Sequence, residues 1–386
     1  MTRMLLALFL AAGAEAPAGA VPSSPSAQDL VYIGTYTGAK SRGIYVARFD
    51  TATGRLGPPE LAAESSNPSF LALHPDQALL YAANEVSEFE GQPAGFVSAF
   101  TIDTSTGRLS PLNRVSSRGA DPCHLVVDGT GKNVLVANYT GGSVASLPIR
   151  PDGSLSAASA FVQHRGSSRD PGRQKGPHAH AVQLDPENRH LLVADLGLDQ
   201  VLLYRFDASR GALEPSVPPY TALSPGAGPR HLAFGQGGRH VYVVNEMDLT
   251  VRVFRYDADR LVEEQTISTL PAGTKGGKDD STAEIQVHPS GRFLYASNRG
   301  PDTIAVFAID PKSGHLTLVE HVPTGGRTPR SFALEPAGRY LLAANQRSDT
   351  VVVFRIDLET GRLSPTGQSV EVGAPVCLTF VPLPRR

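Results

Sequence analysis

One pattern of residues recurs seven times along the chain, about every 50 residues, and it constrains the fold more than any other feature. A clear copy begins with Gly338-Arg339-Tyr340-Leu341-Leu342-Ala343-Ala344-Asn345, an apolar run that ends in asparagine. It continues with Thr350-Val351-Val352-Val353-Phe354 and then a polar turn. The turns of the seven copies start at Asp50, Asp103, Asp152, Asp207, Asp257, Asp310 and Asp357. Repeats of this length that contain several short strands are typical of a β-propeller.

Each copy divides into four expected strands. The first is strongly apolar, as in Phe332-Ala333-Leu334, and the second ends in a polar residue such as Asn345. The third is rich in β-branched residues, and the turn at Asp357 then starts a fourth, outer strand. Four antiparallel strands form one propeller blade, and such blades repeat around a central axis. The sequence therefore predicts an all-β fold, a seven-bladed β-propeller of four-stranded antiparallel blades.

The two ends of the repeat hold complementary parts of one blade. The strand expected at residues 31–35 has no first strand before it, and the strand expected at 377–381 has nothing after it. Pairing the N-terminal strands with the C-terminal strand closes the ring and hides both edges. Because each unit buries its faces only against its neighbours, we expect residues 30–386 to form one domain.

The first 20 residues have the pattern of a secretory signal peptide. Arg3 precedes an apolar stretch at residues 4–12, and Ala18-Gly19-Ala20 supplies the small residues of a cleavage site. The apolar stretch is too short to span a bilayer. We therefore expect a signal peptide at 1–20, a linker at 21–29, and a protein that is exported, periplasmic or secreted, without membrane contact after cleavage. A disordered, alanine-rich extension is the alternative.

Charge and cysteine content exclude some partners. The net charge is −2, and no basic stretch interleaved with aromatic residues appears, which argues against nucleic acid as a partner.

The only two cysteines, Cys123 and Cys377, begin equivalent strands of separate repeats. We expect no disulfide between them, since bridged Cα atoms lie within about 7 Å of each other. We expect the protein to be a monomer.

The most informative variation lies at one mouth of the predicted channel. In an antiparallel blade, the start of the first strand and the end of the second lie at the same end, so seven blades direct two rings of residues to one mouth. The charged members of these rings cluster in consecutive blades and include His180, Arg230, His231, Glu246, Glu284, Arg299 and Arg330. Such charges cost desolvation energy unless they pair or bind a ligand. Their spare positive charge favours a binding site, and a ring of ion pairs between blades is the alternative.

Two other features surround this mouth. Asparagines recur at the ends of the second strands, where we expect them to bond neighbouring loops in a structural role. They are Asn84, Asn138, Asn245, Asn298 and Asn345. The longest insertions, at 86–95, 156–177 and 269–281, lie over the mouth, where binding loops usually occur. The middle insertion carries Arg165, Arg169, Arg173 and Lys175.

Several motifs together resemble one family. They are Tyr32-Ile33-Gly34-Thr35-Tyr36-Thr37, Asn67-Pro68-Ser69, Ala82-Ala83-Asn84-Glu85, Asn138-Tyr139-Thr140-Gly141-Gly142, Pro177-His178-Ala179-His180, Gly228-Pro229-Arg230-His231 and Ala296-Ser297-Asn298-Arg299-Gly300. From about residue 30 to the end, the chain resembles the seven-bladed lactonase family. That family contains the propeller-type 6-phosphogluconolactonases and is related to the carboxymuconate lactonizing enzymes.

The resemblance implies a site at the channel mouth that needs no metal and no cofactor. It implies His180, Arg230, Glu246 and Arg299 as catalytic residues, with Arg330 as the competitor for the position of the second arginine. We expect His231, Arg330, Glu284 and His124 to contact the substrate. The export signal departs from the family pattern, because phosphorylated sugar lactones belong to the cytosol. The resemblance thus implies the lactone chemistry, and the export signal leaves open whether the lactone is phosphorylated.

Lactone hydrolysis suits these residues. A histidine with an ordinary pKa near 6.5 exchanges protons around neutral pH, so we expect His180 to act as base or acid. Glu246 is expected to orient His180 or to activate the water. Arg230 and Arg299 are expected to stabilise the oxyanion and any carboxylate or phosphate of the substrate. The predicted partner is a small, anionic, sugar-type lactone.

Two other functions remain open from the sequence. A muconate-type cycloisomerase would use the same residues, because closing a diacid to a lactone also needs a proton carrier and carboxylate-binding arginines. Runs such as Tyr340-Leu341-Leu342-Ala343-Ala344-Asn345 also resemble those of exported, non-catalytic propellers that act as binding scaffolds.

Overall fold

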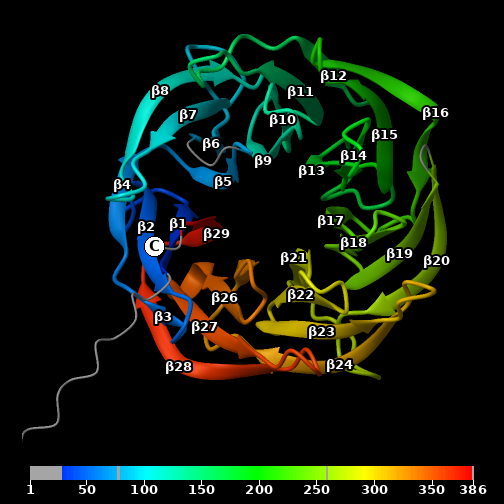
Figure 1. Ribbon diagram of the computed structural model, residues 1–386. Helices are drawn as coiled ribbons and strands as arrows, with labels where there is room; N and C mark the ends of the chain where they lie inside the picture. The colour runs from blue at the N-terminus through cyan, green and yellow to red at the C-terminus, as the bar shows by residue number, and fades with distance from the viewer. Residues whose placement is uncertain (1–27, 76–78, 258–259, 385–386) are drawn as a thin grey trace, which may run out of the picture.

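The computed structural model describes residues 28–75, 79–257 and 260–384. These residues form seven β-sheets around a central axis (Figure 1), which confirms the predicted closed propeller. Within the described residues, the one helical element is a short 3-10 helix, η1 (Gln346–Ser348), and all other regular elements are strands.

The blades follow one another along the chain, from the inner strand to the outer one. The first blade holds β29 (Pro375–Pro382), β1 (Gln28–Thr35), β2 (Gly43–Asp50), β3 (Arg55–Leu56) and β4 (Glu60–Glu64). The second holds β5 (Pro68–Leu73), β6 (Leu79–Asn84), β7 (Phe96–Ile102) and β8 (Leu109–Ser116). The third holds β9 (Pro122–Val127), β10 (Asn133–Asn138), β11 (Ser143–Pro148) and β12 (Ala160–Gln163).

The remaining four blades repeat this order. The fourth holds β13 (Ala179–Leu184), β14 (His190–Asp195), β15 (Gln200–Asp207) and β16 (Ala212–Ala222). The fifth holds β17 (Pro229–Phe234), β18 (His240–Asn245), β19 (Thr250–Asp257) and β20 (Arg260–Ser268). The sixth holds β21 (Ser281–Val287), β22 (Phe293–Arg299), β23 (Thr303–Ile309) and β24 (Leu316–Pro323). The seventh holds β25 (Pro329–Leu334), β26 (Tyr340–Asn345), β27 (Thr350–Ile356) and β28 (Leu363–Glu371).

The ring closes as the sequence predicts. The C-terminal strand β29 pairs antiparallel with β1, with Val31 opposite Phe380, so neither strand leaves an open edge. Strand β1 begins at Gln28, so the folded part starts two residues before the predicted boundary at residue 30. The predicted linker at 21–29 is therefore too long at its end, because Asp29 already pairs with Phe49 and Pro382. Residues 1–27, with the predicted signal peptide at 1–20, lie outside the described residues.

Adjacent blades are held together by buried apolar clusters and by a repeated hydrogen bond. The ring of Phe49 packs edge-on against Tyr340 of the neighbouring blade, with centroids 5.4 Å apart. In four blades, a buried tyrosine of the second strand donates to a glycine carbonyl in a turn of the next blade. These bonds are Tyr32 to Gly107 (2.9 Å), Tyr81 to Gly153 (2.9 Å), Tyr242 to Gly314 (3.0 Å) and Tyr295 to Gly361 (2.9 Å). The turns thus stabilise neighbouring blades as well as their own.

The recurring aspartates have a local role. Oδ1 of Asp357 accepts hydrogen bonds from the backbone N–H groups of Glu359 and Thr360, both at 2.9 Å, which fixes the turn before β28. In the third blade the prediction is wrong, because the turn at Asp152 leads only to an isolated bridge at Leu155 and the outer strand β12 starts at Ala160. The outer strand of the first blade is also divided into β3 and β4.

The hydrogen bonds confirm the structural role predicted for the asparagines. In four cases, Nδ2 donates to a backbone carbonyl of the loop that precedes the blade. These bonds are Asn84 to Ser66 (2.6 Å), Asn138 to Ser117 (3.1 Å), Asn298 to Thr269 (2.9 Å) and Asn345 to Thr324 (3.3 Å). Cys123 and Cys377 are buried free thiols, in agreement with the prediction of no disulfide.

Candidate active site

A β-bulge aims one residue of each inner strand at the mouth. In β13, Ala179 pairs with Asp195 and Ala181 with Ala194, so His180 is an extra residue without a partner in the ladder. Strand β17 repeats this arrangement at Arg230. The equivalent extra residues of the other blades are Ser69, Cys123, Arg330 and Val376, and in the sixth blade Ala283 and Glu284 together oppose Ser297. Bulges turn side chains out of the pleat, which brings residues from different blades together at the hub.

Glu246 is the centre of the charged cluster. Its Oε2 lies 3.1 Å from Nε of Arg230 and 2.9 Å from Nη2 of Arg299, and its Oε1 lies 2.6 Å from Nη2 of Arg173. The carboxylate is 5% exposed. Burial alone would raise the pKa of Glu246, but Arg299, Arg230 and Arg173 together outweigh burial and hold the pKa well below its usual range. Glu246 is therefore a permanent anion at neutral pH and a weak base.

The arginines are fixed by backbone carbonyls. Nη1 of Arg230 donates to the carbonyl of Ala283 at 2.7 Å, and Nη2 of Arg299 donates to the carbonyl of Thr282 at 2.7 Å. Arg230 is 2% exposed, and this burial lowers its pKa to about 10, so it remains a cation at neutral pH. These bonds preorganise two guanidinium groups around one carboxylate, so little reorganisation is needed when a ligand binds.

Arg173 reaches the cluster from the insertion at 156–177. Its Nη2 donates to the hydroxyl of Tyr139 at 2.9 Å as well as to Glu246, while the side chain keeps 45% of its surface exposed. Arg165, Arg169 and Lys175, the other basic residues of this insertion, are exposed. The sequence placed Arg173 over the mouth but gave no signal that separated it from these three.

His180 is a buried imidazole beside the cluster. Its Nε2 lies 3.9 Å from Oε2 of Glu246, and its ring meets those of Tyr139 and His231 edge-on, with both centroid distances at 5.3 Å. The side chain is 4% exposed. Burial lowers the pKa of His180 well below 6.5, and the charge of Arg230 adds to this effect. The imidazole is therefore neutral at neutral pH and able to accept a proton.

Three of the four predicted substrate contacts lie deeper in the hub. His124 lies between Phe70 and His231, with ring centroids 4.0 and 5.0 Å away, and Nδ1 of His231 lies 3.1 Å from Oε1 of Glu284. Burial raises the pKa of Glu284 to about 7. A cavity of about 420 Å³ adjoins this layer. It is lined by residues of the inner strands, including His124, Gln183, His231, Phe234, Glu284 and Thr379.

Arg330, the fourth predicted substrate contact, forms no ion pair with Glu246. Its guanidinium lies over the ring of Tyr36, 5.2 Å from the centroid, and the Tyr36 hydroxyl donates to Glu85 at 2.9 Å. Arg299, and not its competitor Arg330, is thus the second arginine within the cluster. Tyr36, Glu85 and Tyr139 follow the ends of second strands, so the sequence put them at the mouth without indicating a role.

The predicted alternative, a ring of ion pairs between blades, is present in part. Arg299 pairs with Glu246 across two blades, and His231 contacts Glu284 across the same two. No metal-binding group of three or more His, Cys, Asp or Glu side chains occurs in the described part of the chain. The predicted independence of metals and cofactors remains a prediction.

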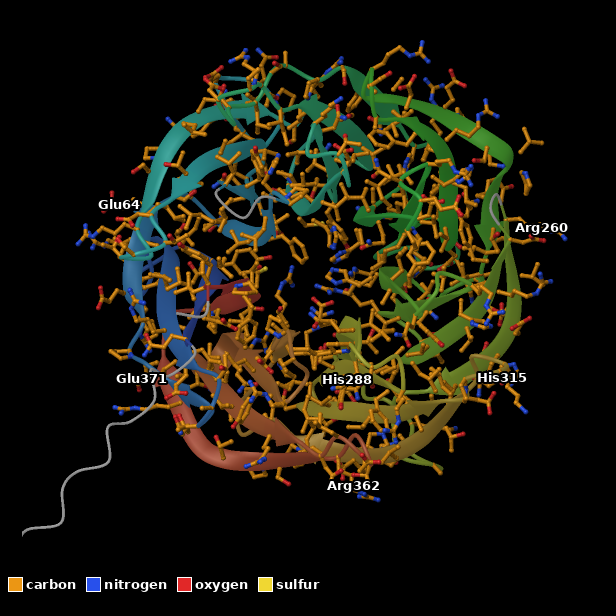
Figure 2. All side chains as sticks on the ribbon, viewed as in Figure 1. Glu64, Arg260, His288, His315, Arg362 and Glu371 are labelled. Atoms are coloured by element: carbon orange, nitrogen blue, oxygen red, sulfur yellow. The ribbon has the colours of Figure 1, made fainter. Side chains whose placement is uncertain are left out.

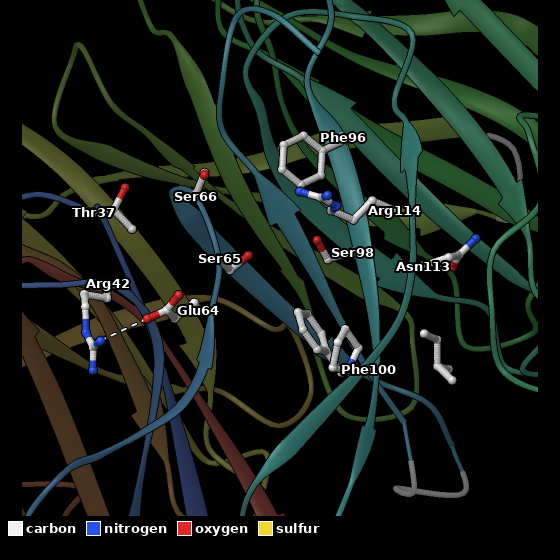
Figure 3. A pocket seen from close by; sticks show the side chains of 12 residues that line it. Thr37, Arg42, Glu64, Ser65, Ser66, Phe96, Ser98, Phe100, Asn113 and Arg114 are labelled. Atoms are coloured by element: carbon white, nitrogen blue, oxygen red, sulfur yellow. Dashed lines mark hydrogen bonds and ion pairs between the residues drawn. The ribbon is translucent and has the colours of Figure 1, made fainter. Parts of the chain in front are cut away.

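Another hollow lies away from the hub, on the flank between the first two blades (Figure 3). It has a volume of about 630 Å³, and Arg42 pairs with Glu64 beside it at 2.9 Å. Its lining contains none of the predicted site residues. Figure 2 shows Glu64, Arg260 and Arg362 similarly at the outer edge, far from the hub side chains. The residues predicted from the sequence to form the site therefore lie elsewhere than in this hollow.

The fold and this cluster, a buried imidazole beside a carboxylate bound by three guanidinium groups, define a closed β-propeller with a candidate active site at its hub. The model of a family described as lactonase, 7-bladed beta-propeller, matches residues 30–380. The chain belongs to this family.

Named relatives agree with this assignment. A 6-phosphogluconolactonase of Bacillus subtilis is 37% identical over 352 residues, which cover 91% of this chain and 97% of the relative. A 6-phosphogluconolactonase of Formosa agariphila is 34% identical over 310 residues, which cover 79% of this chain and 86% of the relative. The solved structure of a periplasmic gluconolactonase of Pseudomonas aeruginosa is 38% identical in sequence and superposes with a TM-score of 0.87. The match covers 92% of this chain and 100% of the chain in that structure.

Proposed function

We propose that the protein hydrolyses a sugar-type lactone at the mouth of the propeller, without a metal ion. The observation that carries this proposal is the neutral, buried His180 next to arginines that Glu246 holds in place. The names of the relatives support hydrolysis over cyclisation of a muconate-type diacid, and the charged hub argues against a purely structural scaffold.

The residues suit each step of the reaction. Nε2 of His180 takes a proton from a water molecule as the water oxygen attacks the lactone carbonyl carbon. Arg230 and Arg299 stabilise the negative charge that develops on the carbonyl oxygen. When the tetrahedral intermediate collapses, the bond to the ring oxygen breaks and the imidazolium returns its proton to that oxygen. The product is the open-chain hydroxy acid.

The geometry supports neither of the two roles expected for Glu246, because no hydrogen bond joins it to His180 and its pKa is depressed. A carboxylate that binds three guanidinium groups and has a depressed pKa is a poor base for water. A charge 3.9 Å from Nε2 of His180 instead stabilises the imidazolium once it forms. Glu246 therefore positions the arginines and supports the protonated state of His180.

We also propose an anionic substrate, a monomeric protein and export to the periplasm or medium. The mouth holds Arg173, Arg230, Arg299 and Arg330 against the carboxylates of Glu246 and Glu85, which leaves an excess of positive charge. The signal-peptide pattern at 1–20 and the periplasmic relative support export. Among the described residues, no helix is long and apolar enough to cross a membrane.

The decisive experiment follows acid release by the purified protein with a panel of aldonolactones, phosphorylated and unphosphorylated. Spontaneous hydrolysis is subtracted, and a muconate-type diacid is included to detect the alternative reaction, cyclisation to a lactone. We expect turnover of at least one lactone. Turnover of the diacid alone, or of none of these compounds, would contradict the proposal.

A further inference from the structure

Arg330 reaches the mouth from an inner strand but lies apart from Glu246. It is the bulged residue of β25, in the position that Arg230 has in β17. Arg173, Arg230 and Arg299 all lie within 3.1 Å of a Glu246 oxygen. Over the described ranges, no hydrogen bond or ion pair joins the guanidinium of Arg330 to another residue, although this side chain is only partly exposed. Its N–H donors therefore lack a protein acceptor.

The ring of Tyr36 holds this guanidinium without using its donors. The Cζ atom of Arg330 lies 5.2 Å from the ring centroid, a cation–π contact that leaves the N–H groups free. The hydroxyl of Tyr36 donates to both carboxylate oxygens of Glu85 at 2.9 Å, which fixes the ring. The cation is thus preorganised and still open to the oxygens of a carboxylate or phosphate group.

Arg330 belongs to the same mouth as the candidate catalytic residues. After burial, Arg230 and His231, its charge is the next cause that lowers the pKa of His180, and it also lowers the pKa of Arg299. Burial would lower the pKa of Arg330 itself, but Tyr36, Glu85 and Glu246 raise it above the ordinary value. Arg330 is therefore a cation at neutral pH.

We infer that Arg330 binds an anionic substituent of the lactone, a carboxylate or a phosphate group remote from the reacting carbonyl. This assignment rests on the proposed function. The arginines on Glu246 hold the carbonyl beside His180, and Arg330 holds the substituent at a separate point of the mouth. Arg330 is then the residue that sets the preference for anionic over neutral lactones.

The test compares three lactones in the wild type and in R330Q. D-glucono-δ-lactone is neutral, its 6-phosphate carries a phosphate, and a D-glucarolactone carries a carboxylate. We expect R330Q to lower kcat/KM about 10- to 100-fold for the matching anionic lactone, mainly through KM, since a lost charged hydrogen bond has this effect. The neutral lactone should change by less than about 3-fold. Comparison of the two anionic lactones tells phosphate from carboxylate.

Two further variants sharpen the comparison. R330K keeps the charge but loses the planar fork, so we expect an intermediate effect. R355Q removes an exposed arginine from β27 of the same blade, and it should leave kcat/KM unchanged for all three lactones. An equal loss for all three lactones would make Arg330 a residue of the reaction itself, and an unchanged preference would remove its role; either result overturns the inference.

Binding separates this inference from the proposed function. Calorimetry with 6-phosphogluconate, D-glucarate and inorganic phosphate needs no turnover. If the wild type hydrolyses no lactone, the proposed function fails, while weaker binding by R330Q still supports the anion site. If the wild type hydrolyses lactones and R330Q binds every anion equally well, only the inference fails. Thermal unfolding of each variant shows whether R330Q or R330K is folded.

Discussion

Nε2 of His180 lies 3.9 Å from Oε2 of Glu246, close enough for a charge pair and too far for a hydrogen bond. Glu246 is thus available to its arginines, while His180 keeps Nε2 free for a proton from water. The pair becomes strongly attractive only when the imidazole is charged, which is the state that follows proton abstraction.

Replacing His180 with Ala is expected to lower kcat for lactone hydrolysis by about 100-fold or more, the usual effect of losing a general base. The fold should remain, because the imidazole nitrogens support no strand pairing. Initial rates with correction for spontaneous hydrolysis measure the effect. H315Q, on the exposed outer edge (Figure 2), is the control and should keep full activity. Full activity of H180A would remove His180 from the mechanism.

The pH dependence of kcat/KM is expected to report His180. The neutral imidazole is the active form, and burial together with Arg230 holds its pKa well below 6.5, so activity should persist below pH 6.5. In R230Q the loss of a nearby cation raises this pKa, and the acid limb should move to higher pH. Profiles measured between about pH 4 and 8 test this. An acid limb that stays in place or moves to lower pH contradicts the assignment.

Glu246→Gln is expected to destabilise the protein by about 3–5 kcal/mol near neutral pH, because three guanidinium groups lose their shared anion. The folded pKa of Glu246 lies below the ordinary value of 4.5, so its contribution is present above pH 4.5 and lost as pH falls further. The difference between wild type and E246Q should therefore shrink towards pH 3. Urea unfolding at several pH values measures it. E371Q, exposed at the outer edge (Figure 2), should show no such pattern.

Tyr295→Phe is expected to lower the free energy of unfolding by about 1–3 kcal/mol, because the buried carbonyl of Gly361 loses its donor in the next blade. Activity should change little, since this bond lies away from the mouth. Y220F is the matched control, because Tyr220 is 44% exposed on β16. Equal stability of Y295F and wild type in urea unfolding would mean that water replaces the bond between the blades.

Much of this arrangement could be predicted from the sequence. The period of the repeat predicted the blades, and the incomplete copies at the two ends predicted the pairing of β1 with β29. Alignment of the copies placed His180 and Arg230 at equivalent positions, which the bulges of β13 and β17 confirm. Each of these inferences depends on contacts within one blade, where the sequence pattern and the geometry repeat.

The sequence did not predict which charges pair. Arg173 and three other basic residues of the same insertion look alike in the sequence, and only the path of the loop brings Arg173 to Glu246. The sequence equally left Arg299 and Arg330 as competitors. Arg299 forms an ion pair with Glu246, whereas Arg330 lies over the ring of Tyr36, because the two arginines extend from different blades across the same hub.

By itself, the sequence determined the strands, their order in each blade and the set of polar residues that reach the mouth, since these follow from local periodicity and turn chemistry. Only the tertiary structure decided which side chains meet there. Closure of the ring brings residues some 50 to 300 positions apart into contact, and the energies of charges depend steeply on those distances and on burial.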